Sequence, residues 1–174
     1  MTALASKNID RARARHAQFR VEQHRAETET WRRGFAGITQ SLPPAIRING
    51  FAMALAHTMS SNGGKEGSRS AKDEHKGAFA ALDTLADWLL TNGLDHAYPA
   101  ASTGLDNASA EHLLARLVRE DQDRYRAGMS EALAYLQWLK LLAKAIAPTE
   151  TERGEEPEGG ARVNAGEERQ NGGG

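Results

Sequence analysis

The sequence of 174 residues contains no cysteine. Disulfide bonds, zinc–thiolate sites and thiol catalysis are therefore excluded, and the absence is typical of a protein from a reducing compartment. The chain also lacks any run in which β-branched and polar residues alternate, which is the pattern of a half-buried strand. We therefore expect essentially no β-sheet.

Long apolar runs are missing as well. Residues 133–147 form the most apolar stretch, but they include Gln137, Lys140 and Lys144 and fall short of the ~18 residues that cross a membrane. The basic residues near the start of the chain are not followed by the apolar segment of a secretory signal. We therefore predict a cytoplasmic protein with no membrane segment.

Charge is distributed unevenly along the chain. The total is −1, but residues 149–174 contain seven Glu and three Arg, a net charge of −4, so residues 1–148 carry +3. Between Lys7 and Arg33 eight basic residues outnumber four acidic ones; this excess would attract a polyanion, although solvated helices often carry as much. We expect residues 1–148 to form one all-α domain and residues 149–174, which have almost nothing to bury, to be a disordered tail rich in Glu and Gly.

Apolar residues recur at helical spacing, which predicts an all-α protein. The expected architecture is a compact bundle of about five to six helices with a long C-terminal helix. Pro43 and Pro44 predict a break, because proline biases the residue before it away from the helical conformation. The helices are expected over residues 8–41, as one bent helix or two with Ile9, Ala12, His16 and Phe19 on one face, and over residues 45–59, 71–92 and 111–146.

The last of these segments organises the rest of the chain. Its apolar residues repeat every three or four positions and share one side of a helix, so Arg126, Glu131 and Lys140 are expected in water. Additional leucines widen the stripe, which indicates several packing neighbours. Asn107 or Ser109 is the expected N-cap. The seam consists of Tyr125, Met129, Ala132, Leu136, Leu139, Ala143 and Ile146.

Reactive chemistry is not evident in the sequence. There is no nucleophile with an adjacent base, no triad of metal ligands and no glycine-rich phosphate loop, so we expect no catalysis, metal or cofactor. His16 and His24 share a face without a third ligand nearby and are interpreted as packed or solvated. The carboxylates Glu120, Asp121 and Asp123 would point in different directions on a helix, and we interpret them as a solvated kink or junction.

Two segments resemble a known family. Residues 42–56, LPPAIRINGFAMALA, are similar to an "LPALIRxNGLxxALA" segment, and Tyr125-Arg126 followed by residues 131–140, EALAYLQWLK, is similar to a "YR…EALAFLQWLKR" ending. Both segments are found in the small subunit of type III-B CRISPR effector complexes, the fifth protein of the Cmr set. Phe51 replaces the usual leucine, Leu141 stands where a basic residue often follows, and the acidic tail matches no motif of the family.

The resemblance implies an all-α subunit without an active site, present in more than one copy and stacked as a minor filament beside the guide-RNA-bound backbone. Its implied partners are the other Cmr subunits, further copies of itself, guide RNA and target RNA, while a different subunit cleaves the target. The composition suits this role. A protein that holds a duplex by its phosphates requires only Arg and Lys on a rigid face, because base pairing supplies the choice of sequence.

Six basic residues are candidates for contact with the RNA backbone. Two of them lie seven residues apart on one face of the first helix, one lies in the first motif and three lie on the last helix, where two are neighbours four residues apart. For each one, a solvated charge is an equally good interpretation. The candidates are Arg13, Arg20, Arg47, Arg126, Lys140 and Lys144.

Several interpretations remain open. Arg47 and Asn49 are as consistent with a polar edge or a buried hydrogen-bonded pair as with ligand contact, and Trp138, which lies off the seam, packs either in the core or against a neighbouring subunit. The alternative function is a generic helical adaptor that binds proteins and no nucleic acid. A helical enzyme with a metal on His16, His57 or His75 has the least support.

Overall fold

The computed structural model describes residues 3–62, 73–92 and 108–147, and every regular element in these ranges is helical. This confirms the predicted all-α class. The expected domain boundary at residue 148 and the expected disorder of residues 149–174 concern residues outside those described. The described elements are α1 (Ala3–Gln23), α2 (Glu29–Asn49), α3 (Phe51–Asn62), α4 (Asp73–Asp87), the π-helix η1 (Trp88–Asn92), α5 (Ala110–Leu117) and α6 (Gln122–Ile146).

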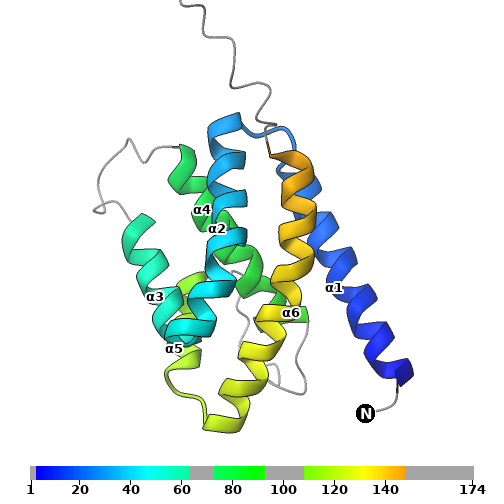
Figure 1. Cartoon of the computed structure of the whole chain (residues 1–174), viewed down its shortest axis with the longest axis vertical. Helices are drawn as coiled ribbons and strands as arrows, with labels where there is room; N and C mark the ends of the chain where they lie inside the picture. The colour runs from blue at the N-terminus through cyan, green and yellow to red at the C-terminus, as the bar shows by residue number, and fades with distance from the viewer. Residues whose placement is uncertain (1–2, 63–72, 93–107, 148–174) are drawn as a thin grey trace, which may run out of the picture.

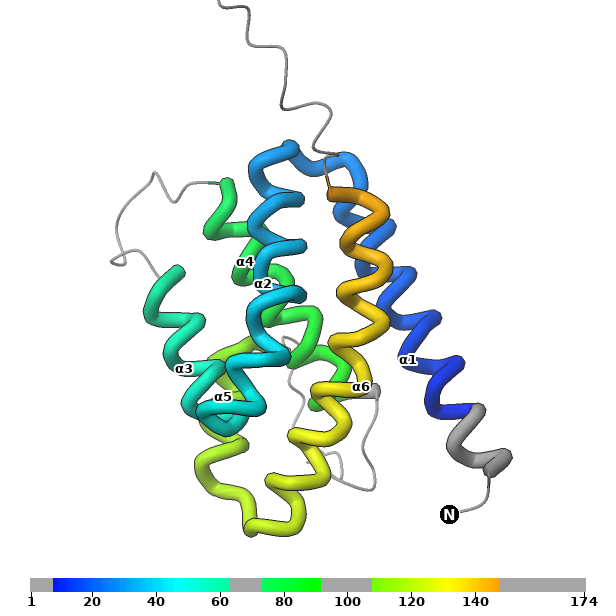
Figure 2. The backbone as a smooth tube through the Cα atoms, viewed as in Figure 1, coloured from blue at the N-terminus to red at the C-terminus, as the bar shows by residue number. Residues whose placement is uncertain are grey.

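Helix α6 has 25 residues and packs against α1, α2, α4 and η1. Figure 1 shows α2 beside it, running in the opposite direction, and α1 on its outer side, while α3 and α5 lie together on the far side of α2. The tube in Figure 2 shows that α1 and α6 run in the same direction. The expectation that the last helix has several neighbours is therefore confirmed.

Two glycines allow α2 and α4 to pack in direct backbone contact. A Cβ atom added to Gly34 would lie 1.9 Å from the carbonyl oxygen of Glu74, and one added to Gly77 would lie 1.9 Å from the carbonyl oxygen of Trp31. Any larger residue at either position would separate the helices. Around this crossing the side chains of Phe35, Leu82 and Leu85 are completely buried.

The predicted break at Pro43 and Pro44 is wrong, because α2 continues through both prolines to Asn49. Leu42 and Ile46, on either side of the prolines, are each only 1% exposed, so burial of this face holds the helix together despite the missing N–H donors. The chain instead changes direction at Gly50, the one described residue with a positive φ, which is 80°. Glycine adopts this conformation without a steric penalty.

The segment predicted as one bent helix or two is two helices. α1 ends at Gln23, and α2 begins after the N-cap Thr28, whose side chain accepts a hydrogen bond from the N–H of Trp31. The predicted face of α1 packs only in part, since His16 contacts other helices but Phe19 is 59% exposed. The buried residues Ala17 and Val21 lie beside that face. The buried side of α1 is otherwise polar, which concealed it from an apolar pattern.

The segment predicted as a single last helix is divided into α5 and α6 at the acidic residues, as the interpretation of a junction proposed. The hydroxyl of Ser109 caps α5, as one of the two expected N-caps. The carboxylate of Asp121 accepts hydrogen bonds from the N–H groups of Asp123 and Arg124 and so begins α6. Glu120, almost buried, pairs with Arg116 at the end of α5.

Candidate nucleic-acid interface

The apolar seam of α6 is confirmed, but the helix is buried on a second side as well. Ala132, Leu136 and Leu139 are at most 1% exposed. Glu131, predicted to lie in water, is only 8% exposed, and Tyr135 is completely buried. This second side lies under α1 and η1, so two neighbours cover positions that the seven-residue seam left free.

Glu131 is held by two side chains from other elements. Arg13 of α1 donates from Nε to Oε1 over 2.7 Å and from Nη2 to Oε2 over 2.5 Å, which is the two-pronged arrangement that guanidinium and carboxylate groups favour. The indole Nε1 of Trp88 donates to Oε1 over 2.9 Å. The hydrogen bond with Glu131 raises the pKa of Arg13 above its ordinary value, although burial opposes this.

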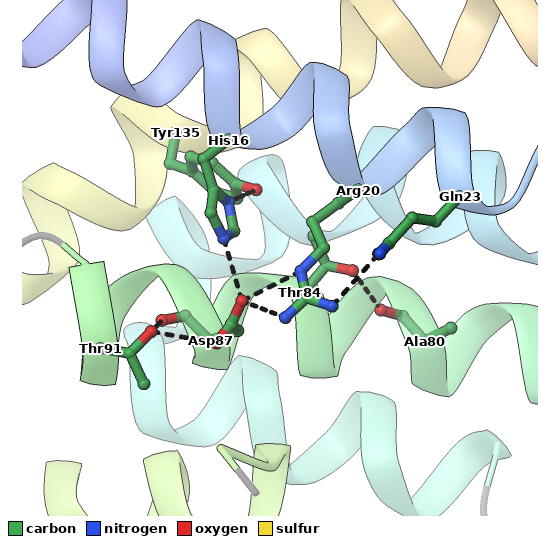
Figure 3. Close-up of polar contacts among 8 residues, drawn as sticks. All are labelled: His16, Arg20, Gln23, Ala80, Thr84, Asp87, Thr91 and Tyr135. Carbon is green, nitrogen blue, oxygen red and sulfur yellow. Dashed lines mark hydrogen bonds and ion pairs between the residues drawn. The ribbon is translucent and has the colours of Figure 1, made fainter. Parts of the chain in front are cut away.

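A second carboxylate, Asp87 at the end of α4, binds α1 through two residues (Figure 3). His16 Nε2 lies 2.9 Å from Asp87 Oδ2 and donates to it, and Arg20 Nε donates to the same oxygen over 3.0 Å. The hydroxyl of Thr91 donates to Oδ1 over 3.0 Å. The hydrogen bonds from His16, Arg20 and Thr91 hold the pKa of Asp87 well below its usual range, although burial opposes this.

The same histidine reaches α6. Its Nδ1 lies 2.7 Å from the hydroxyl of Tyr135, whose ring stacks on Trp88 with centroids 5.1 Å apart and planes 5° apart. Burial raises the pKa of Tyr135, so the phenol stays neutral and can donate to His16 or accept from it. His16 is therefore a packed residue that joins α1 to both α4 and α6.

Arg13 and Arg20 share one face of α1, as predicted, but that face is the packed one. Each guanidinium engages a carboxylate of another element, so in this structure both residues attach α1 to the bundle. Sequence reasoning missed Glu131 and Asp87 as their partners. One signal was available: Arg13, His16 and Arg20 repeat at intervals of three and four, as the contacts of a packed helix do.

The other four candidates lie on the surface. Arg47 on α2 and Arg126, Lys140 and Lys144 on α6 are exposed, and within the described part of the chain none of them forms an ion pair. The three α6 residues are separated by 14 and four positions, which places them on one side of the helix. That side faces solvent, where Ser130, Gln137 and Leu141 are exposed as well.

Acidic residues are scarce around these cations. From Thr30 to Asn62 the chain contains no Asp or Glu, and from Arg124 to Ala147 it contains only Glu131, which is buried against Arg13. Arg33, a further exposed cation of α2 that sequence reasoning did not select, pairs with Glu29 across one helical turn, and such exposed pairs contribute little. We call Arg33, Arg47, Arg126, Lys140 and Lys144 the α2–α6 cations.

A cleft of about 460 Å³ lies between α1, α4 and the start of α5. Its charged groups already have partners. Arg20 pairs with Asp87, and the carboxylate of Asp83 accepts a hydrogen bond from the backbone N–H of Ala110 over 2.9 Å. Burial raises the pKa of Asp83. Among the described residues, no three His, Asp or Glu side chains lie close enough together to hold a metal ion.

The fold and this surface define a class of protein, a helical scaffold with a cationic side that has few carboxylates to oppose it. The family model described as CRISPR-associated protein (Cas_Cmr5) matches residues 9–146, and the chain belongs to this family, the small subunit of the type III-B Cmr complex. None of the curated proteins matches the sequence. No helix in the described ranges is long and apolar enough to cross a membrane.

Family membership implies association with the other subunits of the Cmr complex. The structure also shows how the two motifs of the resemblance are related. The two motifs of the resemblance meet in space, because the hydroxyl oxygen of Tyr125 accepts a hydrogen bond from the N–H of Ala52 over 3.0 Å and lies against Gly50. The tyrosine of one motif thus caps the helix that follows the glycine of the other.

Proposed function

We propose that the chain is a non-catalytic, cytoplasmic subunit that stacks with further copies of itself in the minor filament and contacts the backbone of guide and target RNA. The observation that carries this proposal is the surface of α2 and α6, where the five α2–α6 cations outnumber the exposed carboxylates of these helices, Glu29 and Asp123. Phosphate groups bind Arg and Lys without reference to base sequence. Such a surface suits a guided complex in which base pairing selects the target.

In this proposal the six basic residues predicted from the sequence divide into two groups. Arg47, Arg126, Lys140 and Lys144 contact RNA directly, because their charges are exposed and lack acidic partners among the described residues. Arg13 and Arg20 act indirectly by fixing α1 to Glu131 and Asp87. From Arg126 to Lys144 the cations extend over ~27 Å of helix, at 1.5 Å per residue, which is enough to follow several phosphates.

The test is a charge reversal in the assembled complex. Lys140→Glu with Lys144→Glu is expected to weaken binding of target RNA at least about tenfold at low salt and to reduce the slope of log affinity against log salt by ~1.5–2. Arg11→Glu with Arg15→Glu is the matched control, since these residues are also exposed and four apart but lie on α1. The two variants have the same net charge, so only the location differs.

The outcome separates the proposal from its rival. Equal, small losses in both variants would show that net charge matters and the α2–α6 surface does not. An intact complex in which neither variant changes the affinity or its salt dependence would favour a helical adaptor without nucleic-acid contact. Measurements on the complex are preferred, because several copies acting together supply affinity that a single copy lacks.

A further inference from the structure

The described part of the chain ends at Ala147, three residues beyond Lys144, and a strongly acidic segment follows it. Residues 149–174 have a net charge of −4, and five of their seven Glu fall between Glu150 and Glu158 with a single Arg. The negative charge is therefore concentrated immediately after α6. The family model ends at residue 146, so this segment is outside the part of the chain that the family shares.

The length of this segment matches the surface beside it. The segment has 26 residues, and a generic Gly-rich linker of that length has a root-mean-square span of roughly 28 Å. Helix α6 extends ~27 Å from Lys144 back to Arg126. A tethered segment reaches its highest effective concentration when its span equals the distance to be covered. Few carboxylates oppose the α2–α6 cations, since Arg33 is the one member of this set that has an acidic partner among the described residues.

We propose that the Glu-rich segment 149–174 folds back over the α2–α6 cations of its own chain and competes with RNA for them. This rests on the proposed function, because the competition has a consequence only if RNA binds there. A row of carboxylates has the same sign of charge as a phosphate backbone, but it carries fewer negative charges per unit length than an RNA duplex does. The segment thus screens the surface from weak, non-specific RNA and yields to a guide–target duplex that many copies hold together.

The expected strength follows from tethering. An effective concentration on the order of 1 mM, with an intrinsic affinity on the order of 0.1 mM as in non-specific phosphate binding, lowers the affinity for RNA roughly tenfold. The effect is electrostatic and should fade as salt screens it.

The first experiment measures the affinity of the full chain for a labelled single-stranded RNA of mixed sequence. Changing the acidic cluster to glutamine is expected to tighten binding roughly tenfold at about 50 mM salt, and the difference should largely vanish near 0.5 M. Changing Arg153, Arg162 and Arg169 to Gln makes the segment more negative and should weaken binding. The variant of the cluster combines Glu150→Gln, Glu152→Gln, Glu155→Gln, Glu156→Gln and Glu158→Gln.

Equal affinities for all three proteins would overturn the proposal while leaving the RNA-binding surface intact. If none of the three binds RNA, alone or in the complex, the proposed function fails instead. The two failures are therefore distinguishable.

A second experiment needs no RNA. Arg126→Lys places an amine at the far end of the α6 surface, and a zero-length carbodiimide reagent joins an amine to a carboxylate that touches it. Mass spectrometry is expected to find the new amine coupled to a Glu of 150–168, and the coupling should fall when RNA is added. Arg11→Lys on α1 is the control and should couple less. A mixture of isotope-labelled and unlabelled chains shows whether the coupling occurs within one chain or between two. Coupling between chains would assign the segment to a neighbouring copy and overturn the proposal.

Discussion

Two contacts within the bundle hold their helices by different means. Helix α2 meets α4 through Gly34 and Gly77, with backbone against backbone and apolar side chains around them. Helix α1 meets α6 and the end of α4 mainly through charged and polar groups, and among its described side chains only Ala17 and Val21 are buried completely or nearly so. The first contact depends on shape and the second on ionisation, so we expect them to respond to different changes.

The difference shows how a basic helix can be misread. Arg and His residues on α1 indicate a solvated or RNA-binding surface by their charge alone, yet here they are the packing side of the helix. Buried ion pairs contribute less net stability than apolar packing, but removing one partner is costly because the other charge is left buried and unpaired. The α1 contact is therefore expected to be sensitive to single charge changes, while the α2–α4 contact is sensitive to volume.

The largest expected effect is a loss of packing between α2 and α4. Gly34→Ala should lower the free energy of unfolding by about 3 kcal/mol or more, because the new Cβ meets a backbone carbonyl at 1.9 Å that has no flexible end to move. Urea denaturation measures it. Gly37→Ala is the control, since it meets nothing within 4 Å and should gain about 0.5–1 kcal/mol from helix propensity. Similar losses in both would contradict this account of the contact.

Glu131→Gln tests the ionic contact. The variant should lose about 3 kcal/mol, because the guanidinium of Arg13, only 14% exposed, keeps the exposed carboxylate of Asp10 as its one opposing charge among the described residues. Replacing both partners, Arg13→Met with Glu131→Gln, should restore much of the loss, since no unpaired buried charge remains and the amide oxygen of the glutamine can still accept the hydrogen bond from Trp88. A double variant as unstable as the single one would show that shape, not charge, dominates the α1 contact.

Asp87 provides a prediction about pH. Because its pKa is lowered in the folded protein, its contribution to stability is complete above about pH 4, the pKa of an unfolded Asp, and is lost as the pH falls below that value. Asp87→Asn should cost about 2 kcal/mol at neutral pH and should flatten the decline in acid. Urea denaturation from pH 3 to 7 checks it. Glu22→Gln, an exposed carboxylate of α1 that pairs with the exposed Arg25, should do neither.

The smallest expected effect concerns a neutral hydrogen bond. Tyr125→Phe removes the acceptor for the N–H of Ala52 and should cost about 1 kcal/mol. No charge is involved, so the loss should be the same at low and high salt, as for the glycine contact. A loss of stability that changed with salt would indicate that charged groups also stabilise the corner between α2 and α3, as they do the α1 contact.

Periodicity predicted much of the fold because an apolar side of a helix is visible in one dimension. The seam of α6 was accessible in this way, and residue preferences indicated the N-cap of α5 and the junction at the acidic residues. The prolines misled the prediction because propensity is a local preference, and burial of Leu42 and Ile46 outweighs it. Gly50 proved to be the turn, a role that the prediction had assigned to the prolines.

The candidate surface was predicted in part. Exposure of Arg47, Arg126, Lys140 and Lys144 agrees with the sequence pattern, whereas the carboxylates that hold Arg13 and Arg20 lie 118 and 67 residues away along the chain. No local pattern pairs residues at such separations. Whether the exposed cations contact RNA stays a prediction until the charge reversals are measured.

The amino-acid sequence by itself determined the helical class, the apolar seam and the excess of positive charge before the acidic segment, because these depend on side-chain type and spacing. Only the tertiary structure decided which positive charges are available. Packing brought Glu131 and Asp87 against α1 and neutralised two arginines there, while it left the solvent sides of α2 and α6 with cations that have almost no carboxylate to oppose them.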